Sequence, residues 1–309
     1  MKGRYLCCVI STIVLVAVAV CATGQVSRTW DAGGDGFWWF DPENWKPDGD
    51  PDPNDDLTVT SGAPWAGFDE YVYVASGSIV LNGPMAEAMF EDFQFDVGVS
   101  ARGEVQVLGG AMLSSEASSL GVGATGYGTA TVSGEYSRWD PTTLYVGADG
   151  KGVLHVLAGG TVGSDEGVIG GTISSVGDAT VQDANSTWET YGADLTVGES
   201  GTGTLDVLSA GKVASGAGYI GRYSDGNGTV TVNDALWQLD GDLTVGECGK
   251  AALNVSSGGR VALSAMGPSS AYVGRQAGAS GRVVLDGDAT VLDLGYANLT
   301  VGDDGNATI

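Results

Sequence analysis

Basic residues are scarce in this chain, which has 13 lysines and arginines against 38 aspartates and glutamates and a formal net charge of −25 at pH 7. A surface this acidic repels phosphate groups, which argues against nucleic acid and anionic membrane as partners. Histidine is rarer still, because His155 is the only one in 309 residues. Any catalytic triad or metal site that needs histidine would have to be built around this single position.

Residues 1–22 hold three of the four cysteines, so the rest of the chain has almost none. In this segment Lys2 and Arg4 precede an uncharged apolar run that ends at Val20. The pattern is typical of a cleaved secretory signal peptide and not of a transmembrane helix. A lipoprotein signal is the alternative and would use Cys21, but Val20 is large for the residue before a lipidated cysteine. We predict a secreted or cell-surface protein with no transmembrane segment in the mature chain.

The region after about residue 100 lacks any amphipathic helical stripe and instead repeats itself about every 25 residues. Each unit opens with an alternating strand and closes with an apolar residue followed by glycine. The paired inward residues of the opening strand are Val105/Val107, Ala130/Val132, Leu154/Val156, Ala179/Val181, Leu205/Val207, Val230/Val232, Leu253/Val255, Val283/Leu285 and Ala307/Ile309. The closing pairs are Val97-Gly98, Val122-Gly123, Val146-Gly147, Ile169-Gly170, Val197-Gly198, Ile220-Gly221, Val245-Gly246, Val273-Gly274 and Val301-Gly302.

These units predict an all-β fold, a parallel β-helix (β-solenoid). A unit of this length, with period-2 alternation and glycine punctuation, cannot bury a core alone, so neighbours must stack. In one unit we expect strands at residues 203–208, 212–214 and 219–221, separated by corners of Gly, Ser and Asp. Successive coils should lie about 4.8 Å apart.

Residues 23–100 differ in composition, since they contain five of the eight tryptophans, and are expected to form an aromatic-rich N-terminal cap with degenerate first coils. Phe90, Phe93 and Phe95 lead into the first closing strand and are expected to form the first of these coils. A cap is needed because the first coil of a solenoid exposes an apolar end and an unpaired strand edge.

The units that begin at Gly201 (GTGTLDVLSAG) and Gly228 (GTVTVNDALWQL) alternate, with tryptophan in every second unit. They resemble the type V secretion and PEP-CTERM-associated repeat, and the segment TWDAGGDGFWWFDPENW resembles the leader found ahead of such repeats in bacterial surface proteins. The resemblance covers residues 25–309 and implies an autotransporter-passenger-like β-helix at or outside the cell surface, with no catalytic residues to carry over.

Neither a translocator nor a C-terminal sorting segment follows the repeats, which departs from the pattern of that family. The chain ends at Ile309, in the first strand of a coil. We therefore expect the repeat region, residues 101–309, to be incomplete at its C-terminus.

An acidic turn supplies the candidate metal site. Asp48, Asp50, Asp52 and Asp55 space their carboxylates much as a calcium-binding loop does. The turn lacks the glycine and the glutamate that complete an EF-hand, and its prolines stiffen it, so the alternative is a solvated acidic turn. Calcium is the one cofactor that the sequence suggests, and we expect that the protein requires none.

His155 lies between the inward residues Leu154 and Val156, which predicts that its side chain points to solvent. Asp206 stands in the same outward column two coils away, at about 9.6 Å, whereas a nucleophile and its base need about 3 Å. A polar ladder is therefore favoured over a catalytic site. Cys248, the one cysteine left after signal cleavage, takes a corner position, cannot form an intramolecular disulfide and receives no role.

Three tryptophans, Trp139, Trp188 and Trp237, occupy the middle strand of alternate coils, with valine at the matching position between them. Alternation of large and small side chains fills a narrow core without strain. This interpretation is favoured over its alternative, an outward aromatic ladder that binds glycans.

Tyr145, Tyr219 and Tyr272, here called the tyrosine row, take the outward position that threonine holds in other closing strands. Together with those threonines they are expected to form an exposed ridge. This ridge is the candidate binding surface.

Two classes of function remain open. The first is a secreted or cell-surface, non-catalytic scaffold or adhesin-like protein that contacts extracellular polysaccharide or surface proteins. The alternative is a β-helical polysaccharide lyase or hydrolase, although a fold alone is a weak argument for an activity. An enzyme should gather acids and bases irregularly on one face, whereas the acids here recur at corners with the period of the repeat. The sequence therefore favours the first class.

Overall fold

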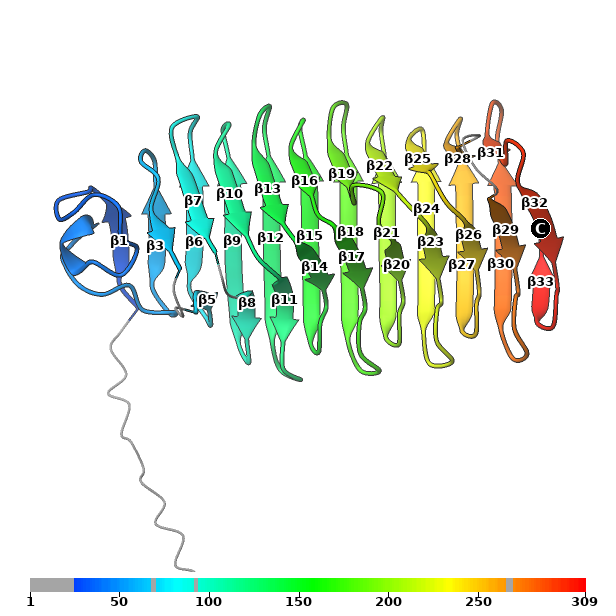
Figure 1. The fold of residues 1–309 in the computed structure, drawn as a ribbon, viewed down its shortest axis with the longest axis horizontal. Helices are drawn as coiled ribbons and strands as arrows, with labels where there is room; N and C mark the ends of the chain where they lie inside the picture. Colours follow the sequence, from blue (N-terminus) through cyan, green and yellow to red (C-terminus); the bar gives the residue numbers. More distant parts are fainter. Residues whose placement is uncertain (1–24, 68–70, 92–93, 265–268) are drawn as a thin grey trace, which may run out of the picture.

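The computed structural model describes residues 25–67, 71–91, 94–264 and 269–309. The signal segment and Phe93 lie outside the described residues. Within these ranges the chain has 33 strands and one short 3-10 helix, η1 (Pro42–Asn44), but no α-helix. The strands wind into an elongated solenoid with the N-terminal segment at one end (Figure 1).

Three sheets run along the solenoid. The first sheet contains, in spatial order, β2 (Trp45–Lys46), β1 (Ser27–Trp30), β3 (Asp56–Val59), β6 (Ser78–Asn82), β9 (Arg102–Leu108), β12 (Tyr127–Ser133), β15 (Lys151–Leu157), β18 (Val176–Gln182), β21 (Thr202–Leu208), β24 (Asn227–Asn233), β27 (Lys250–Ser256), β30 (Ser280–Asp286) and β33 (Asn306–Thr308). The second sheet contains β4 (Trp65–Ala66), β7 (Glu87–Phe90), β10 (Met112–Ser115), β13 (Arg138–Pro141), β16 (Thr161–Gly163), β19 (Thr187–Glu189), β22 (Lys212–Ser215), β25 (Leu236–Leu239), β28 (Arg260–Leu263) and β31 (Val291–Asp293). The third sheet contains β5 (Tyr73–Val74), β8 (Phe95–Val99), β11 (Ser118–Val122), β14 (Thr143–Val146), β17 (Glu166–Ile169), β20 (Leu195–Val197), β23 (Gly218–Ile220), β26 (Leu243–Val245), β29 (Ser270–Val273) and β32 (Asn298–Val301).

Each coil contributes one strand to each sheet, and β3, β4 and β5 form the first coil. Every pairing between coils is parallel, so the predicted parallel β-helix is confirmed. Two full coils precede residue 100. In the repeat unit used above, the strands are β21, β22 and β23, within one or two residues of their expected bounds.

The core consists of columns of side chains that occupy the same position in successive coils. Leu205 pairs with Val230 and Val207 with Val232, and all four side chains are fully buried. The alternation of inward and outward residues along a strand places Asp206 on the opposite face of the same strand. The predicted inward column is therefore confirmed through the middle of the rod.

The tryptophan column lies in the core, as predicted. Trp139, Trp188 and Trp237 are completely buried, and each pairs with valine in the neighbouring coil. Each indole Nε1 also donates a hydrogen bond to a buried serine of the preceding coil, at 3.0, 3.2 and 3.1 Å; these are the hydroxyls of Ser115, Ser164 and Ser215. The alternation therefore fills volume and also satisfies the buried indole N–H groups.

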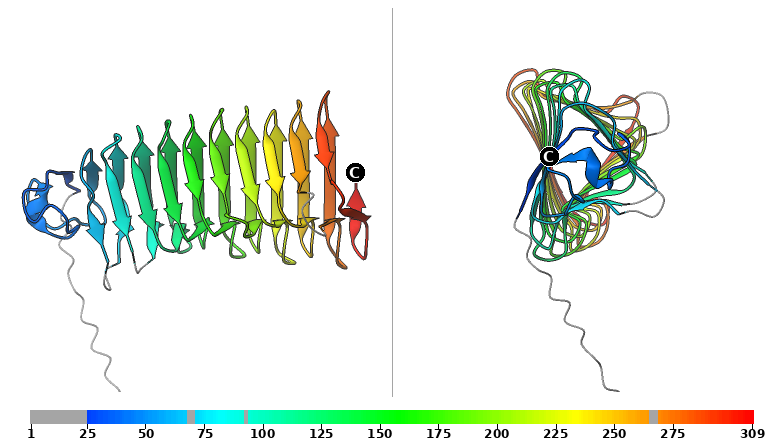
Figure 2. Two further views of the ribbon diagram at one scale, coloured as in Figure 1. Left: turned by 45° about the horizontal axis from the view of Figure 1, so that its top comes forward. Right: turned by 90° about the vertical axis from the view of Figure 1, so that its left-hand side faces the viewer.

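The cap closes the N-terminal end with aromatic rings, and Figure 2, viewed along the rod, shows it lying across the coil interior. Trp39 contacts Trp45 and Phe90, each with ring centroids 4.9 Å apart. Phe90 contacts Phe95, whose ring lies 6.3 Å from that of Trp139. The edge of the first sheet is β2, which has only two residues and pairs antiparallel with β1. So short an edge offers little template for pairing with another chain.

One closing pair was predicted two residues too late. Leu120, and not Val122, pairs with Val97, and Leu120 is the fully buried residue. The partner glycine is Gly121, with φ of +73°, where a Cβ would lie 2.2 Å from the carbonyl oxygen of Lys151 in β15. This close approach of two backbones fixes the glycine position, whereas apolar residues on either side of it look equally suitable in the sequence.

The register of the last predicted inward pair was also wrong, although Ala307 packs against the core as expected. Ala307 pairs with Gly281 and not with Val283, so the register differs by two residues. Ile309 is 57% exposed and Leu285, in β30, is 44% exposed, because few side chains pack on them at this end of the solenoid. Without an aligned partner on each side, alternation alone does not fix the register.

Candidate functional site along the third sheet

The tyrosine row lies on the outer face of the third sheet. Strand pairing connects Tyr145 to Val168, Val168 to Thr196, and Thr196 to Tyr219. The column then continues through Thr244 to Tyr272. Tyr145 and Tyr219 are thus three coils apart, about 14 Å, and Tyr219 and Tyr272 are two coils apart, about 10 Å. The expected shared position of tyrosine and threonine is confirmed.

The row is recessed and does not form the exposed ridge that was expected. Thr196 and Thr244 are buried, at 1% and 0% exposure, and all three tyrosines are half-buried. Burial raises the pKa of the Tyr219 hydroxyl, and nearby acids, with Asp194 first among them, raise it further. Arg222, which follows the closing strand of its coil, reaches back over this face and donates a 3.4 Å hydrogen bond to the Thr196 hydroxyl.

Arginine side chains lie over two of the three tyrosines. The guanidinium of Arg222 is 4.7 Å from the ring centroid of Tyr219, and that of Arg275 is 4.5 Å from Tyr272. Both distances are within the range of a cation–π interaction. These contacts place a guanidinium group over each of the two rings.

The arginines belong to a column of alternating charge that begins one residue after the closing glycines. Arg222 lies 4.0 Å from the Glu199 carboxylate, and Arg275 donates a 3.3 Å hydrogen bond to Glu247. Each arginine is thus held by a carboxylate of the preceding coil as well as by a tyrosine ring. A partly buried pair of this kind fixes the side chain more than an exposed pair would.

A hollow of about 230 Å³ opens beside Tyr145, where the same column carries no arginine. Its lining consists of Ser119, Tyr145, Ala148, Asp149, Gly171, Thr172 and Glu199. Burial raises the pKa of the Tyr145 hydroxyl, and the charges of Glu166 and Glu199 raise it further. The hollow is therefore aromatic on one side and acidic on the other.

A buried carboxylate lies nearer the cap in the same outward column. Asp96 is 3% exposed, accepts a hydrogen bond from the Tyr71 hydroxyl, and accepts a second from Gln94 Nε2 at 2.8 Å. Burial raises the pKa of Asp96. Tyr71 in turn stacks on Tyr73, with ring centroids 4.9 Å apart. This cluster was not predicted, because in the sequence Asp96 is only one residue of a closing strand.

The acidic turn is not assembled as a metal site. Asp55 is 4% exposed and forms an ion pair with Arg28 at 3.0 Å, while its other oxygen accepts a hydrogen bond from the Val26 N–H. Among the described residues, no group of three or more acidic, histidine or cysteine side chains is placed to hold a metal ion. Asp48, Asp50, Asp52 and Asp55 are therefore not brought together, and calcium binding stays a prediction.

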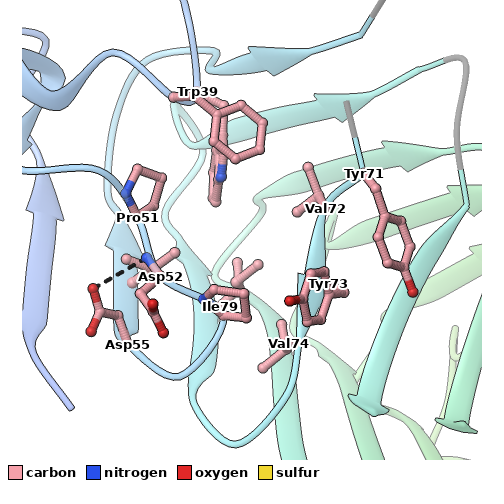
Figure 3. A pocket seen from close by; sticks show the side chains of 12 residues that line it. Trp39, Pro51, Asp52, Asp55, Tyr71, Val72, Tyr73, Val74 and Ile79 are labelled. Carbon is pink, nitrogen blue, oxygen red and sulfur yellow. Dashed lines mark hydrogen bonds between the residues drawn. The ribbon is translucent and has the colours of Figure 1, made fainter. Parts of the chain in front are cut away.

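Two of these acids line a second hollow of about 100 Å³, between the cap and the first coil. Figure 3 shows Asp52 and Asp55 beside Pro51, facing Tyr71 and Tyr73 across the opening, with the Asp52 N–H donating to Asp55. The hollow is small and mostly apolar.

The remaining candidates are placed as predicted. His155 pairs with Thr131 and Thr180 in the outward column of the first sheet, and Asp206 pairs with Thr180 one coil further. The two are thus two coils apart and form no catalytic pair. Cys248 is a half-buried free cysteine in a corner.

One signal in the sequence distinguishes Tyr145 from Tyr219 and Tyr272. The segments after Tyr219 and Tyr272 read Tyr-Ile-Gly-Arg and Tyr-Val-Gly-Arg, whereas the segment after Tyr145 reads Tyr-Val-Gly-Ala. The presence or absence of arginine three residues after the tyrosine decides whether the ring is covered. The sequence alone does not show that this arginine lies over the tyrosine ring, because that depends on how the chain folds after the closing strand.

The fold and this surface define the class of the protein as a capped parallel β-solenoid with one aromatic, acidic hollow on its third sheet. Comparisons with models of protein families, with curated proteins and with solved structures find no match for this chain. No helix in the described ranges is long and apolar enough to cross a membrane.

Proposed function

We propose that this protein is a non-catalytic scaffold at or outside the cell surface, an adhesin-like stalk whose repeated outer surface contacts extracellular polysaccharide. The observation that carries the proposal is the regularity of the outer columns over many coils. From Gln106 through His155 to Asn254, the outward positions of the first sheet stay in strict register, and polar residues fill them. Repeated surfaces of this kind suit contact with a repeating polymer.

The sequence resemblance to the type V secretion and PEP-CTERM-associated repeat supports the same proposal. Export through a cleaved signal peptide would place the rod outside the cytoplasm. The strongly negative charge, −25 in all, favours neutral or cationic partners over acidic ones.

Co-sedimentation with insoluble polysaccharides tests the proposal, with the release of reducing ends and of unsaturated sugars measured in the same samples. We expect binding without release of either product. Release that depends on the protein would contradict the non-catalytic assignment and favour the lyase or hydrolase alternative. Absence of binding to every polysaccharide would contradict the adhesin-like role.

A further inference from the structure

Tyr145 differs from Tyr219 and Tyr272 in what surrounds its ring. The residue three positions later is Ala148, at the place where Arg222 and Arg275 cover the other two rings. Among the residues that the structure describes, no cationic side chain lies over the Tyr145 ring. The next coil contributes Gly171, whose missing side chain would start 3.6 Å from Tyr145 Cδ1. Two small residues in succession thus open the hollow.

The other walls of the hollow carry hydrogen-bond acceptors. Asp149, Glu199 and Thr172, whose side chains carry acceptor oxygens, are among the residues that line it. No lysine or arginine is among these lining residues, and Glu199 is paired with Arg222 at 4.0 Å. An acidic ligand would meet repulsion here, while a ligand rich in hydroxyl or amine protons would find acceptors.

The size of the hollow limits what it can hold. At about 230 Å³ it is smaller than the roughly 300–1,000 Å³ of pockets for drug-sized ligands. Its aromatic wall is flat, and one sugar ring presents a flat apolar face of C–H groups with hydroxyls at its rim. A single ring of a longer chain therefore fits the combination of an aromatic platform and acidic acceptors.

We propose that the Tyr145 hollow binds one pyranose ring of a neutral or amino polysaccharide, stacked on Tyr145, with its hydroxyl or amine protons donated to Asp149 and Glu199. This inference rests on the proposed role in polysaccharide contact and assigns that contact to one position. Tyr219 and Tyr272 then serve as covered, structural members of the row. Acidic polymers such as polyuronates are excluded by the carboxylates.

Calorimetric titration of the purified protein with cellohexaose, hexaglucosamine and hexagalacturonate tests the specificity. We expect the neutral hexamer, the amino hexamer or both to bind at one site per chain, and hexagalacturonate to bind at least tenfold more weakly. Binding of hexaglucosamine alone identifies the amine as the recognised group; binding of cellohexaose identifies the hydroxyls. Equal or tighter binding of hexagalacturonate, or no binding of any hexamer, would overturn the inference.

Ala148→Arg tests the position, because it copies the arrangement at Tyr219 and Tyr272 and closes the hollow without altering Tyr145. We expect at least a tenfold loss of affinity, and a similar loss for Tyr145→Thr, which installs the residue of neighbouring coils. Tyr272→Thr is the matched control and should change affinity less than twofold. Unchanged melting temperatures confirm that each variant folds.

The outcomes separate this inference from the general proposal. If the protein binds a hexamer but Ala148→Arg does not change the affinity, the assignment of the binding site to the hollow is wrong, while the proposed contact with polysaccharide stands. If Tyr272→Thr weakens binding as much as Tyr145→Thr does, the whole row binds and the assignment to one position is overturned.

Discussion

At the scale of single residues, the direction in which a side chain points decides its tolerance to change. Val207 is fully buried in the first sheet, and Asp206 beside it is half-exposed on the outer face. The two residues share the same strand and the same backbone pairing to β24. They therefore form a natural test of the inward and outward assignment.

Val207→Asp should lower the free energy of unfolding by more than about 4 kcal/mol, because it buries a charge with no partner in a stacked apolar column. Asp206→Ser is the control and should change it by less than about 0.5 kcal/mol. Denaturant melts of both variants measure the difference. Equal costs would contradict the assignment of faces.

A second residue-scale effect concerns Asp96, whose pKa is raised above the ordinary value of an aspartate chiefly by burial. A raised pKa means that the folded protein holds the proton more tightly than the unfolded chain does. This residue's contribution to stability is therefore greatest below pH 4 and is lost as the pH rises through its folded pKa. The hydrogen bonds from Tyr71 and Gln94 lower the pKa of Asp96 and so lessen that loss, but they do not reverse its sign.

Asp96→Asn removes this titration while keeping a side chain that can hydrogen-bond to Tyr71. Relative to the natural protein, the variant should become progressively more stable as the pH rises from about 4 to 7. Melting temperatures of both proteins across this range measure the trend. A stability difference that stays constant with pH would contradict the raised pKa.

At the scale of strands and coils, the glycine of each closing strand sets how closely neighbouring coils approach. Gly121 and Gly123 have nearly the same φ, +73° and +77°, yet they differ in what surrounds them. A Cβ on Gly121 would lie 2.2 Å from a backbone oxygen, whereas one on Gly123 would meet only the Ser100 hydroxyl at 3.3 Å. Backbone cannot move aside as a side chain can.

Gly121→Ala should therefore cost at least about 2 kcal/mol more than Gly123→Ala, because both pay the strain of positive φ but only the first forces two coils apart. Chemical denaturation of the two variants gives the comparison. A larger cost for Gly123→Ala would contradict Gly121 as the closing glycine and would favour Val122-Gly123, the closing pair predicted from the sequence.

At the scale of the whole molecule, the described residues form ten stacked three-stranded coils, with β33 beginning another, and these make an elongated body. A spacing of about 4.8 Å per coil gives a stack of roughly 50 Å, before the cap is added. Aromatic contacts run from the cap through Phe90 and Phe95 to Trp139, so the cap packs directly on the coil core.

Small-angle scattering should therefore give the profile of a rod, and circular dichroism should show strands with almost no α-helix. A compact sphere or substantial helix would contradict the solenoid.

Removal of the aromatic contact by Phe90→Ala should lower the melting temperature, because it leaves a cavity between the cap and the coils.

The sequence determined the period, the parallel β-helix, the inward columns and the buried tryptophans, since these follow from local alternation repeated in every coil. Only the tertiary structure decided which tyrosine ring is open, that Thr196 and Thr244 are buried, and that Asp55 pairs with Arg28. It also fixed Gly121 as the closing glycine. The physical reason is the same in each case: these features depend on contacts between chain segments about 25 residues apart, and the geometry of such contacts is absent from the pattern within any one coil.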